Sequence, residues 1–210
     1  MSANELAEAG VATVYEARGR RGLVDESFEP LLPGRAIAGP ARTALCGQDD
    51  NRAVHEVMAH VRPGDVLVLT MPEPRPVALL GDLLATQALA RGAAAVLVDA
   101  AVRDVADLRE LGLPVWTRWR RVKGADKNVR GAVNVPVTVG GATIDPGDLV
   151  VLDDDRATGA APHRALKKPS GLRASMTLTS SAPSDVRREP AAGPATFAPP
   201  AGPGPRRAGR

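Results

Sequence analysis

The chain is poor in cysteine and in aromatic residues. Its 210 residues include one cysteine, Cys46, and only 2% are aromatic. A single cysteine excludes an internal disulfide and a zinc site built from several cysteines, so we expect a protein of the reducing cytoplasm. With few large rings available, the core must be built from Val, Leu, Ala and Ile.

Long hydrophobic runs are absent as well. No apolar run approaches the roughly 20 residues that a membrane-spanning helix needs. The first residues, 1–5, show no charged region followed by an apolar stretch. We therefore expect neither a membrane anchor nor a secretory signal. The hydrophobic content of 44% is enough for one sizeable core, and one folded domain is expected.

Charge and proline divide the chain near residue 155. Residues 1–155 hold 17 Lys and Arg against 22 Asp and Glu, a balance of −5, whereas residues 156–210 hold 10 against 2, a balance of +8. Nine of the 19 prolines also follow Asp155. Such a segment cannot bury enough apolar surface to offset the entropy of ordering it. We therefore predict a folded domain over 1–155 and a disordered tail, rich in Ala, Pro and Arg, over 156–210.

The folded part has the pattern of an α/β domain that becomes β-rich toward its end. Helix caps and Gly or Pro separators predict helices over 3–17, 50–60, 81–91 and 104–111. Apolar runs predict strands over 35–45, 66–70, 93–99 and from 114, then short strands over 133–139, 142–144 and 149–152. Gly39-Pro40 is expected to mark a bulge or a sheet edge. This mixture argues against a plain doubly wound nucleotide fold.

The stretch from Gly81 to Asp104 concentrates the candidate chemistry. It predicts a helix start at Gly81-Asp82-Leu83-Leu84, then a buried strand, then Arg103-Asp104 just after that strand. The first N–H groups of a helix have no partner within it and lie at the positive end of its dipole, so they suit a carboxylate. A proline-rich loop over 71–76 is expected to fold over this site. The sequence thus predicts a site for a small anionic substrate.

Arg103 and Asp104 have complementary roles in this hypothesis. The Arg103 guanidinium is permanently charged and can hold a carboxylate or a developing enolate oxygen through two hydrogen bonds. Asp104 offers the hard oxygen that Mg²⁺ or Mn²⁺ prefers, with open positions left on the metal for a 2-oxo acid. The alternative, commoner for an Arg-Asp pair, is structural: Asp104 caps the next helix and Arg103 is solvated.

Other polar residues have commoner structural explanations. Histidines without a partner at metal-ligand spacing, a cysteine without an assignable base, and loop lysines are expected to be packing or solvated groups. These residues are His55, His60, His163, Cys46, Lys123 and Lys127. Gly140-Gly141 is expected to be a hairpin turn, because no GKS or GKT follows it to form a phosphate loop.

A set of short motifs in a particular order carries a family resemblance. They are Gly39-Pro40-Ala41, Asp50-Asn51 ahead of His55, Pro63-Gly64-Asp65-Val66-Leu67-Val68, Gly81-Asp82-Leu83-Leu84-Ala85, Val102-Arg103-Asp104, Leu113-Pro114-Val115, Lys123-Gly124 with Lys127, Val133-Asn134-Val135-Pro136-Val137, and Pro146-Gly147-Asp148 leading to Asp153. Over residues 5–155 the chain resembles the family that includes 4-hydroxy-4-methyl-2-oxoglutarate aldolase, 4-carboxy-4-hydroxy-2-oxoadipate aldolase and the regulator of RNase E activity A.

The resemblance implies a fold, an assembly and a site. The fold would be a swivelling β/β/α-type sandwich, and the assembly a homotrimer or a homohexamer of two trimers, with sites near subunit interfaces. Backbone groups of Gly81-Asp82-Leu83-Leu84 and the side chain of Arg103 would bind the pyruvyl part of a small keto-acid substrate. Asp104 would hold a divalent metal, Mg²⁺ or Mn²⁺.

The activity that the resemblance implies is a metal-dependent, class II-type retro-aldol cleavage. Its substrate would be 4-hydroxy-4-methyl-2-oxoglutarate or 4-carboxy-4-hydroxy-2-oxoadipate, and its product pyruvate. Oxaloacetate decarboxylation would be a side activity, because both reactions leave the same pyruvate enolate for Arg103 to stabilise. Asp82 is the nearest candidate in the sequence to take the C4 hydroxyl proton.

Two other functions remain open at this point. The same family contains regulators of a ribonuclease, which act through a protein surface without catalysis. The basic tail, with ten Lys and Arg after Asp155, could contact nucleic-acid phosphates with little sequence preference. We expect a small-molecule substrate rather than a nucleic acid.

The chain departs from the family pattern in two places. Asp99-Ala100-Ala101 replaces the usual Asp-Gly ahead of Arg103, which requires a negative φ at the alanines. After Asp155, Ala, Pro and Arg replace the usual run of valines and the C-terminal helix. We interpret residues from 156 onward as the product of a shifted reading frame or as a fused tail, so the last strand and helix of the family fold would be missing.

Overall fold

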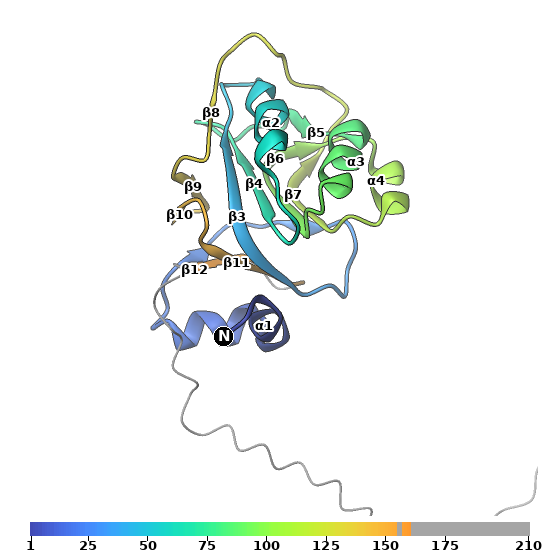
Figure 1. Ribbon diagram of the computed structural model, residues 1–210. Helices are drawn as coiled ribbons and strands as arrows, with labels where there is room; N and C mark the ends of the chain where they lie inside the picture. Colours follow the sequence, from blue (N-terminus) through green and yellow to red (C-terminus); the bar gives the residue numbers. More distant parts are fainter. Residues whose placement is uncertain (155–156, 161–210) are drawn as a thin grey trace, which may run out of the picture. The chain divides into compact units, whose positions relative to one another are not determined.

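The computed structural model describes residues 1–154 and 157–160, all within one compact unit (Figure 1). Its helices are α1 (Ala3–Ala17), α2 (Arg52–Val57), the 3-10 helix η1 (Met58–His60), α3 (Asp82–Ala90) and α4 (Val105–Leu111). Its strands are β1 (Leu23–Val24), β2 (Glu29–Pro30), β3 (Ile37–Leu45), β4 (Val66–Thr70), β5 (Ala78–Leu80), β6 (Ala95–Val102), β7 (Val115–Arg120), β8 (Ala132–Val133), β9 (Val137–Val139), β10 (Ala142–Ile144), β11 (Leu149–Leu152) and β12 (Ala157–Ala160). The predicted tail beyond residue 160, its possible nucleic-acid surface and His163 lie outside the described residues.

A mixed sheet of ten strands organises the fold. Its order is β1-β12-β11-β3-β4-β6-β7-β2, with β5 beside β6 and β8 beside β3. Strands β3, β4, β6 and β7 run parallel to their neighbours in this series, and β5 runs parallel to β6. The remaining pairs are antiparallel, and β9 and β10 form a separate hairpin. The predicted mixed sheet with βα crossovers and a β-rich later part is confirmed.

The central strands contribute to two cores through the alternation of their side chains. On β4, Leu67 and Leu69 belong to one buried cluster, while Val66 and Val68 belong to another. The first cluster contains buried residues of α2, α3 and α4, and the second contains those of β9, β10 and β11. Because both faces of the sheet are covered, β4 is buried along its whole length and is apolar from Val66 to Leu69. The layers are those of the predicted β/β/α sandwich, with α2, α3 and α4 together on one side (Figure 1).

Helix α1 packs separately, against β11. A third buried cluster joins the two elements through Leu6, Val11, Val14 and Val151. The helix is interrupted at Gly10, where φ is +76°. Directly after the interruption, the Val11 N–H donates a hydrogen bond to Asp153 Oδ2 at 2.8 Å. This carboxylate therefore fastens the second half of α1 to the segment that follows β11.

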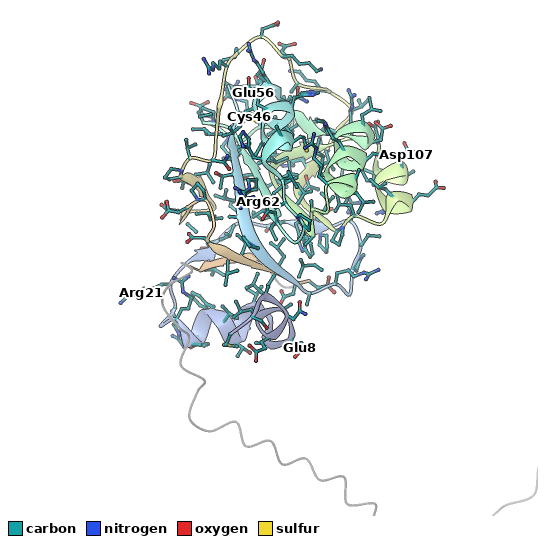
Figure 2. The ribbon with its side chains drawn as sticks, viewed as in Figure 1. Glu8, Arg21, Cys46, Glu56, Arg62 and Asp107 are labelled. Carbon is teal, nitrogen blue, oxygen red and sulfur yellow. The ribbon has the colours of Figure 1, made fainter. Side chains whose placement is uncertain are left out.

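Cys46 is buried in the same cluster as the buried residues of α2. Figure 2 labels it near that helix. Burial raises the pKa of its thiol to about 12, and the nearby negative charge of Asp50 acts in the same direction. The thiol is therefore protonated at neutral pH and unreactive as a nucleophile. The prediction that Cys46 acts as a small buried hydrophobe is confirmed.

Two local predictions can be compared with the structure. Gly39-Pro40 lies within β3 where the paired strand changes: β3 pairs with β11 up to Pro40 and with β4 from Ala41 onward, so these two residues are paired on one side only, as at a sheet edge. Glycine is needed at position 39 because a Cβ there would collide with the carbonyl oxygen of Gly64. The helix predicted over 50–60 is α2 followed by a single 3-10 turn.

The sequence patterns do not predict β5 or β12. Strand β5 has three residues, too few to show a period. Strand β12 lies in the segment assigned to the tail, and it pairs with β11 and β1. No helix in the described part of the chain combines the length and the apolar character needed to cross a bilayer.

Candidate functional site

Two adjacent parallel strands, β5 and β6, end at the same edge of the sheet. Leu80 pairs with Val102, and the Arg103 N–H donates to the Leu80 carbonyl oxygen at 3.1 Å. Gly81 then forms the N-cap of α3, and Arg103-Asp104 leads into α4. Ligands of open α/β sheets bind outside the carboxyl ends of parallel strands. The pairing of β5 with β6 therefore brings together the two predicted motifs, which are separated in sequence by α3 and β6.

The alanines before Arg103 fit this strand. Ala100 and Ala101 are fully buried in β6, and neither is among the non-glycine residues with positive φ in the described part of the chain. The requirement for a negative φ at these two alanines, which the sequence predicted, is therefore met. Asp99, also buried, forms an ion pair with Arg118 at 2.9 Å; burial raises the pKa of Asp99, and Arg118 opposes that effect.

Asp104 occupies the N-cap position of α4 but does not cap it. Its backbone is left-handed, with φ 57° and ψ 43°, and its side chain makes no capping hydrogen bond to α4. Instead its Oδ2 accepts a hydrogen bond from the Asp82 N–H at 3.3 Å and lies 3.3 Å from Arg103 Nε. Non-glycine residues in such conformations are uncommon and concentrate at functional sites. The carboxylate is thus held by the start of α3 and by Arg103. The N-cap interpretation does not explain this arrangement.

Two glycines leave room for this pair. Gly81 has φ −141°, which any residue can adopt, so glycine is needed there for space. A Cβ on Gly81 would lie 2.6 Å from Asp104 Oδ2 and 3.1 Å from Arg103 Nε. A Cβ on Gly124 would lie 2.8 Å from Arg103 Nη1. The guanidinium and the carboxylate therefore lie directly against backbone that carries no side chain.

A cavity of about 110 Å³ opens at this sheet edge. It is lined by Asn51, His55, Ala78, Leu80, Gly81, Asp82, Leu83, Leu84, Arg103, Gly124, Ala125 and Lys127. Every residue predicted to bind substrate is in this group. Asp104 is not: it borders a neighbouring recess of about 210 Å³, which Arg103 also lines. Arg103 therefore connects the predicted metal ligand with the cavity.

The cavity has two walls that are formed by different elements of the fold. We call Gly81-Asp82-Leu83-Leu84 and Arg103 the strand-end wall, and Asn51, His55 and Lys127 the helix-loop wall. The sequence pointed to the first wall, whereas His55 and Lys127 were assigned packing or solvated roles. The spacing of Asn51 and His55, four residues apart, was a usable signal, because it places both on one helix face. The loop 71–76, which was expected to cover the site, is not part of the lining.

Asp50 fixes the loop that carries Lys127. Its two oxygens accept three hydrogen bonds from backbone N–H groups, those of Arg52 at 2.8 Å, Asn128 at 2.5 Å and Val129 at 2.9 Å. Burial alone would raise the pKa of Asp50, but these N–H groups outweigh it and hold the pKa below its usual range. The buried carboxylate is therefore ionised and ties the loop to the start of α2.

Asn51 and His55 give the helix-loop wall its polar character. Asn51 is 8% exposed, and its Nδ2 donates to the Leu79 carbonyl oxygen at 3.2 Å. Its Oδ1 is buried and has no hydrogen-bond partner among the described residues. For His55, partial burial and then the positive charge of Lys127 lower the pKa, while Asp50 acts in the opposite direction. The imidazole is therefore neutral at pH 7.

The donor set fits a divalent cation held by a single protein carboxylate. Mg²⁺ keeps several waters and commonly uses one or two carboxylates together with substrate oxygens. Asp104 provides one such group, since Oδ2 contacts Asp82 and Arg103 while Oδ1 accepts no hydrogen bond from the described residues. No group of three or more His, Cys, Asp or Glu with metal-binding geometry occurs in residues 1–154 and 157–160. An all-protein metal cage therefore does not fit this edge of the sheet.

Two curated relatives share a name. A protein of Halalkalibacterium halodurans named "Putative 4-hydroxy-4-methyl-2-oxoglutarate aldolase" is 36% identical over 132 residues, which cover 63% of this chain and 63% of that protein. A protein of Shewanella oneidensis with the same name is 33% identical over 133 residues, covering 63% of this chain and 80% of that protein. The matched part thus spans less than two thirds of the first relative's length.

Solved structures give the same fold. The RNA-processing inhibitor RraA of Thermus thermophilis superposes with a TM-score of 0.65 at 29% identity, covering 77% of this chain and 95% of that one. A Streptomyces coelicolor member of the RNase ES inhibitor RraA protein family superposes with a TM-score of 0.66 at 33% identity, covering 76% and 84%. The family model described as "RraA-like: Aldolase/RraA" matches residues 5–157. The chain therefore belongs to the RraA-like (Aldolase/RraA) family.

Proposed function

We propose that this chain is a metal-dependent aldolase that releases pyruvate from 4-hydroxy-4-methyl-2-oxoglutarate or 4-carboxy-4-hydroxy-2-oxoadipate. Oxaloacetate decarboxylation would be its side activity. The observation that carries the proposal is the convergence of Arg103, Asp104 and the first turn of α3 at one sheet edge. The aldolase names of two relatives at 33% and 36% identity support it.

The strand-end wall binds the pyruvyl end of the substrate in this proposal. The first N–H groups of α3 have no partner within the helix, and that of Asp82 contacts Asp104. The N–H groups of Leu83 and Leu84 are then the donors available to the C1 carboxylate, at the positive end of the helix dipole. The Arg103 guanidinium lies beside them and reaches the C2 oxygen, where negative charge develops during the reaction.

Asp104 would hold a divalent cation, Mg²⁺ or Mn²⁺, which when bound supplies Lewis-acid polarisation of the 2-oxo acid. The Asp104 carboxylate is positioned for this role by the Asp82 N–H and by Arg103. Such second contacts fix the orientation of a ligand oxygen. The left-handed backbone of Asp104 directs the carboxylate toward α3 instead of α4.

Bond cleavage then follows one course for both substrates. In the aldol substrate Asp82 takes the C4 hydroxyl proton, the C3–C4 bond breaks, and its electron pair passes to C3 and the C2 carbonyl. A second carbonyl compound leaves from C4, and the pyruvate enolate remains. In oxaloacetate the bond to the departing CO₂ breaks and leaves the same enolate. Arg103 stabilises its oxygen in each case, and protonation at C3 gives pyruvate.

The test is pyruvate release with Mg²⁺ and then with excess chelator. We expect activity that appears with the metal and disappears with the chelator. Arg103→Ala should lower kcat by about 10²- to 10³-fold, the usual effect of removing one group that stabilises an oxyanion. Asp104→Asn, which keeps the shape of the side chain, should abolish stimulation by the metal.

The matched control is Arg91→Ala, which removes a cation at the other end of α3. Arg91 follows the last residue of that helix and does not line the cavity. Its variant should keep the wild-type rate. Unchanged rates in both Arg103→Ala and Asp104→Asn would end the proposal, as would pyruvate release that is indifferent to chelator.

A second candidate function is regulation of a ribonuclease. It is favoured by the likeness to the RraA structures, one of which is covered over 95% of its length. Ribonuclease activity measured with and without this chain distinguishes the candidates. Under the regulatory function, inhibition should persist in Arg103→Ala because it depends on a protein surface. Under the aldolase function alone, the chain should leave the ribonuclease rate unchanged.

We further propose a cytoplasmic homotrimer or homohexamer. Leu83, on the strand-end wall, is 77% exposed, and Val122, beside Asp104 in the neighbouring recess, is 88% exposed. Exposed apolar side chains near a site are typical of interaction surfaces. Light scattering should give a mass of three or six chains, and Leu83→Glu should lower it. A monomeric wild-type protein would contradict the proposed assembly.

A further inference from the structure

Asn51, one of the residues that line the cavity, has an unsatisfied acceptor in its side-chain amide. Its Nδ2 donates to the Leu79 carbonyl oxygen at 3.2 Å, so the orientation of the amide is fixed. Flipping the group would place Oδ1 against that carbonyl, two acceptors in contact. The Oδ1 atom is therefore buried, and it has no hydrogen-bond partner in the described part of the chain. Asn51 itself is 8% exposed and lines the cavity.

A buried acceptor without a partner is costly, because nothing replaces the hydrogen bonds that it would make to water. Buried polar groups are nearly always satisfied, so an exception indicates a missing partner. The partner of Oδ1 must be a donor. On a small keto acid that is ionised at neutral pH, the carboxylate and carbonyl oxygens are acceptors, and a hydroxyl group is the one donor. Asn51 is thus matched to a substrate that carries a hydroxyl.

Lys127 adds a charge requirement to the same wall. Lys127 lines the cavity, and the neutral His55 adds no second charge there. A group that reaches this wall therefore meets one cation and one acceptor. This pairing suits a hydroxyl beside a carboxylate, whereas the strand-end wall offers backbone N–H groups and Arg103. The two walls would therefore distinguish the two ends of a diacid, because each wall offers different hydrogen-bonding and charged partners.

We propose that Asn51 Oδ1 accepts a hydrogen bond from a substrate hydroxyl, and that the cavity therefore selects hydroxyl-bearing diacids over those that lack the hydroxyl. The inference rests on the proposed function, because it takes the strand-end wall as the subsite for the pyruvyl end. Asn51 is a specificity-determining residue here, and Lys127 draws in the adjacent carboxylate. A site that holds a buried acceptor discriminates strongly against ligands without the donor, because binding such a ligand leaves the acceptor unpaired.

The test uses two probes that cannot be cleaved, 2,4-dihydroxyglutarate and 2-hydroxyglutarate, with Mg²⁺ present. They differ by the second hydroxyl, and neither has the C2 carbonyl that cleavage requires. Calorimetry on the wild-type chain should show that the dihydroxy compound binds about tenfold more tightly, the effect of roughly 1.4 kcal/mol. Equal affinity, or no binding of either probe, overturns the proposal, and equal affinity would assign the partner of Oδ1 to water.

Two variants separate recognition from structure. Asn51→Leu removes the acceptor and the donor, whereas Asn51→Asp keeps an acceptor oxygen and loses the bond to Leu79. Both should lower the unfolding temperature, but the preference for the dihydroxy probe should disappear in Asn51→Leu and persist in Asn51→Asp. Equal loss in the two variants would show a purely structural role. Asn4→Leu, on the exposed surface of α1, is the control and should keep the wild-type preference.

Turnover separates this inference from the proposed function. The ratio of kcat/KM for 4-hydroxy-4-methyl-2-oxoglutarate to that for oxaloacetate should fall about tenfold in Asn51→Leu. A wild-type chain that cleaves neither compound but keeps the Asn51-dependent preference would refute the aldolase and retain the hydroxyl subsite. A wild-type chain that cleaves both, with a ratio indifferent to Asn51→Leu, would retain the aldolase and refute the subsite.

Discussion

The two walls of the cavity are built in different ways. The strand-end wall follows directly from β5 and β6, and it presents backbone N–H groups together with Arg103. The helix-loop wall presents side chains, from the start of α2 and from a long loop after β7. That loop is held by the three hydrogen bonds to Asp50 rather than by a sheet. One wall is therefore fixed by the sheet, and the other by a single buried carboxylate.

This difference suggests that the two walls have different functions. Groups that stabilise a developing charge must be held rigidly, because small displacements are costly in rate. Strand ends and close-packed glycines provide that rigidity. Groups that choose among substrates can be side chains on a loop, where substitution changes a binding preference without moving the reacting atoms. We therefore expect changes in the strand-end wall to lower kcat and changes in the helix-loop wall to alter KM or specificity.

Among the substitutions that test this comparison, the largest effect should follow from crowding the strand-end wall. Gly81→Ala would place a Cβ 2.6 Å from Asp104 Oδ2 and 3.1 Å from Arg103 Nε. Because φ is −141°, the backbone tolerates alanine, and the strain falls on the Arg103-Asp104 pair. A displacement of about 1 Å can cost about 10²-fold in rate, so we expect a loss of that order in kcat for pyruvate release, with an unfolding temperature near that of the wild type.

Gly124→Ala is the matched comparison. Its Cβ would meet Arg103 Nη1 at 2.8 Å, the far end of a flexible side chain that can shift. We expect a smaller loss, about tenfold, with the same assay. Equal losses of kcat in Gly81→Ala and Gly124→Ala would show that displacing the Asp104 carboxylate adds nothing to the effect of displacing Arg103.

The strand-end wall could be predicted from the sequence because its signals are local. Gly81 followed by an Ala- and Leu-rich helix, a buried apolar run, and then Arg103-Asp104 fixes the order strand, helix, strand. Parallel strands joined by a helix end at the same edge, so their following residues meet there. What the sequence could not give was the direction of the Asp104 side chain, because a left-handed backbone at an aspartate leaves no pattern in neighbouring residues.

The helix-loop wall could not be predicted in the same way. Lys127 lies in a segment without periodicity, and its place depends on hydrogen bonds from Asn128 and Val129 to a carboxylate 78 and 79 residues earlier in the chain. Local patterns carry no information on contacts at that separation. Asn51 also resembled an N-cap, whereas its side chain makes no capping bond and reaches Leu79 instead. Because asparagine is favoured at helix starts, the sequence did not indicate that Asn51 lines a cavity.

Releasing the loop should have the next largest effect. Asp50→Asn replaces an ionised acceptor of three N–H groups by a neutral amide, and we expect the free energy of unfolding to fall by about 2 kcal/mol. Because the pKa of Asp50 is lowered in the fold, its contribution is present above the usual carboxyl pKa and is lost as pH falls through the folded-state value. Denaturant unfolding of the two proteins should therefore differ at pH 7 and converge in acid.

Amide exchange provides the local check on the same variant. The N–H groups of Asn128 and Val129 should lose protection in Asp50→Asn, while those of β6 should keep it relative to global stability. Loss of protection spread evenly over the whole domain would contradict a specific role of Asp50 in holding the loop.

The smallest effect should come from the exposed cation of the helix-loop wall. Lys127→Ala should raise KM for the anionic substrate about fivefold, equivalent to roughly 1 kcal/mol for a solvent-exposed charge, and leave kcat within about twofold. The difference from the wild type should shrink at high ionic strength, because exposed charges are screened. Lys123→Ala, on the same loop but outside the cavity lining, provides the matched control and should keep the wild-type KM. If Lys127→Ala instead lowered kcat as strongly as Arg103→Ala, the division between a catalytic strand-end wall and a selective helix-loop wall would fail, since a loop cation would then act on the reacting atoms.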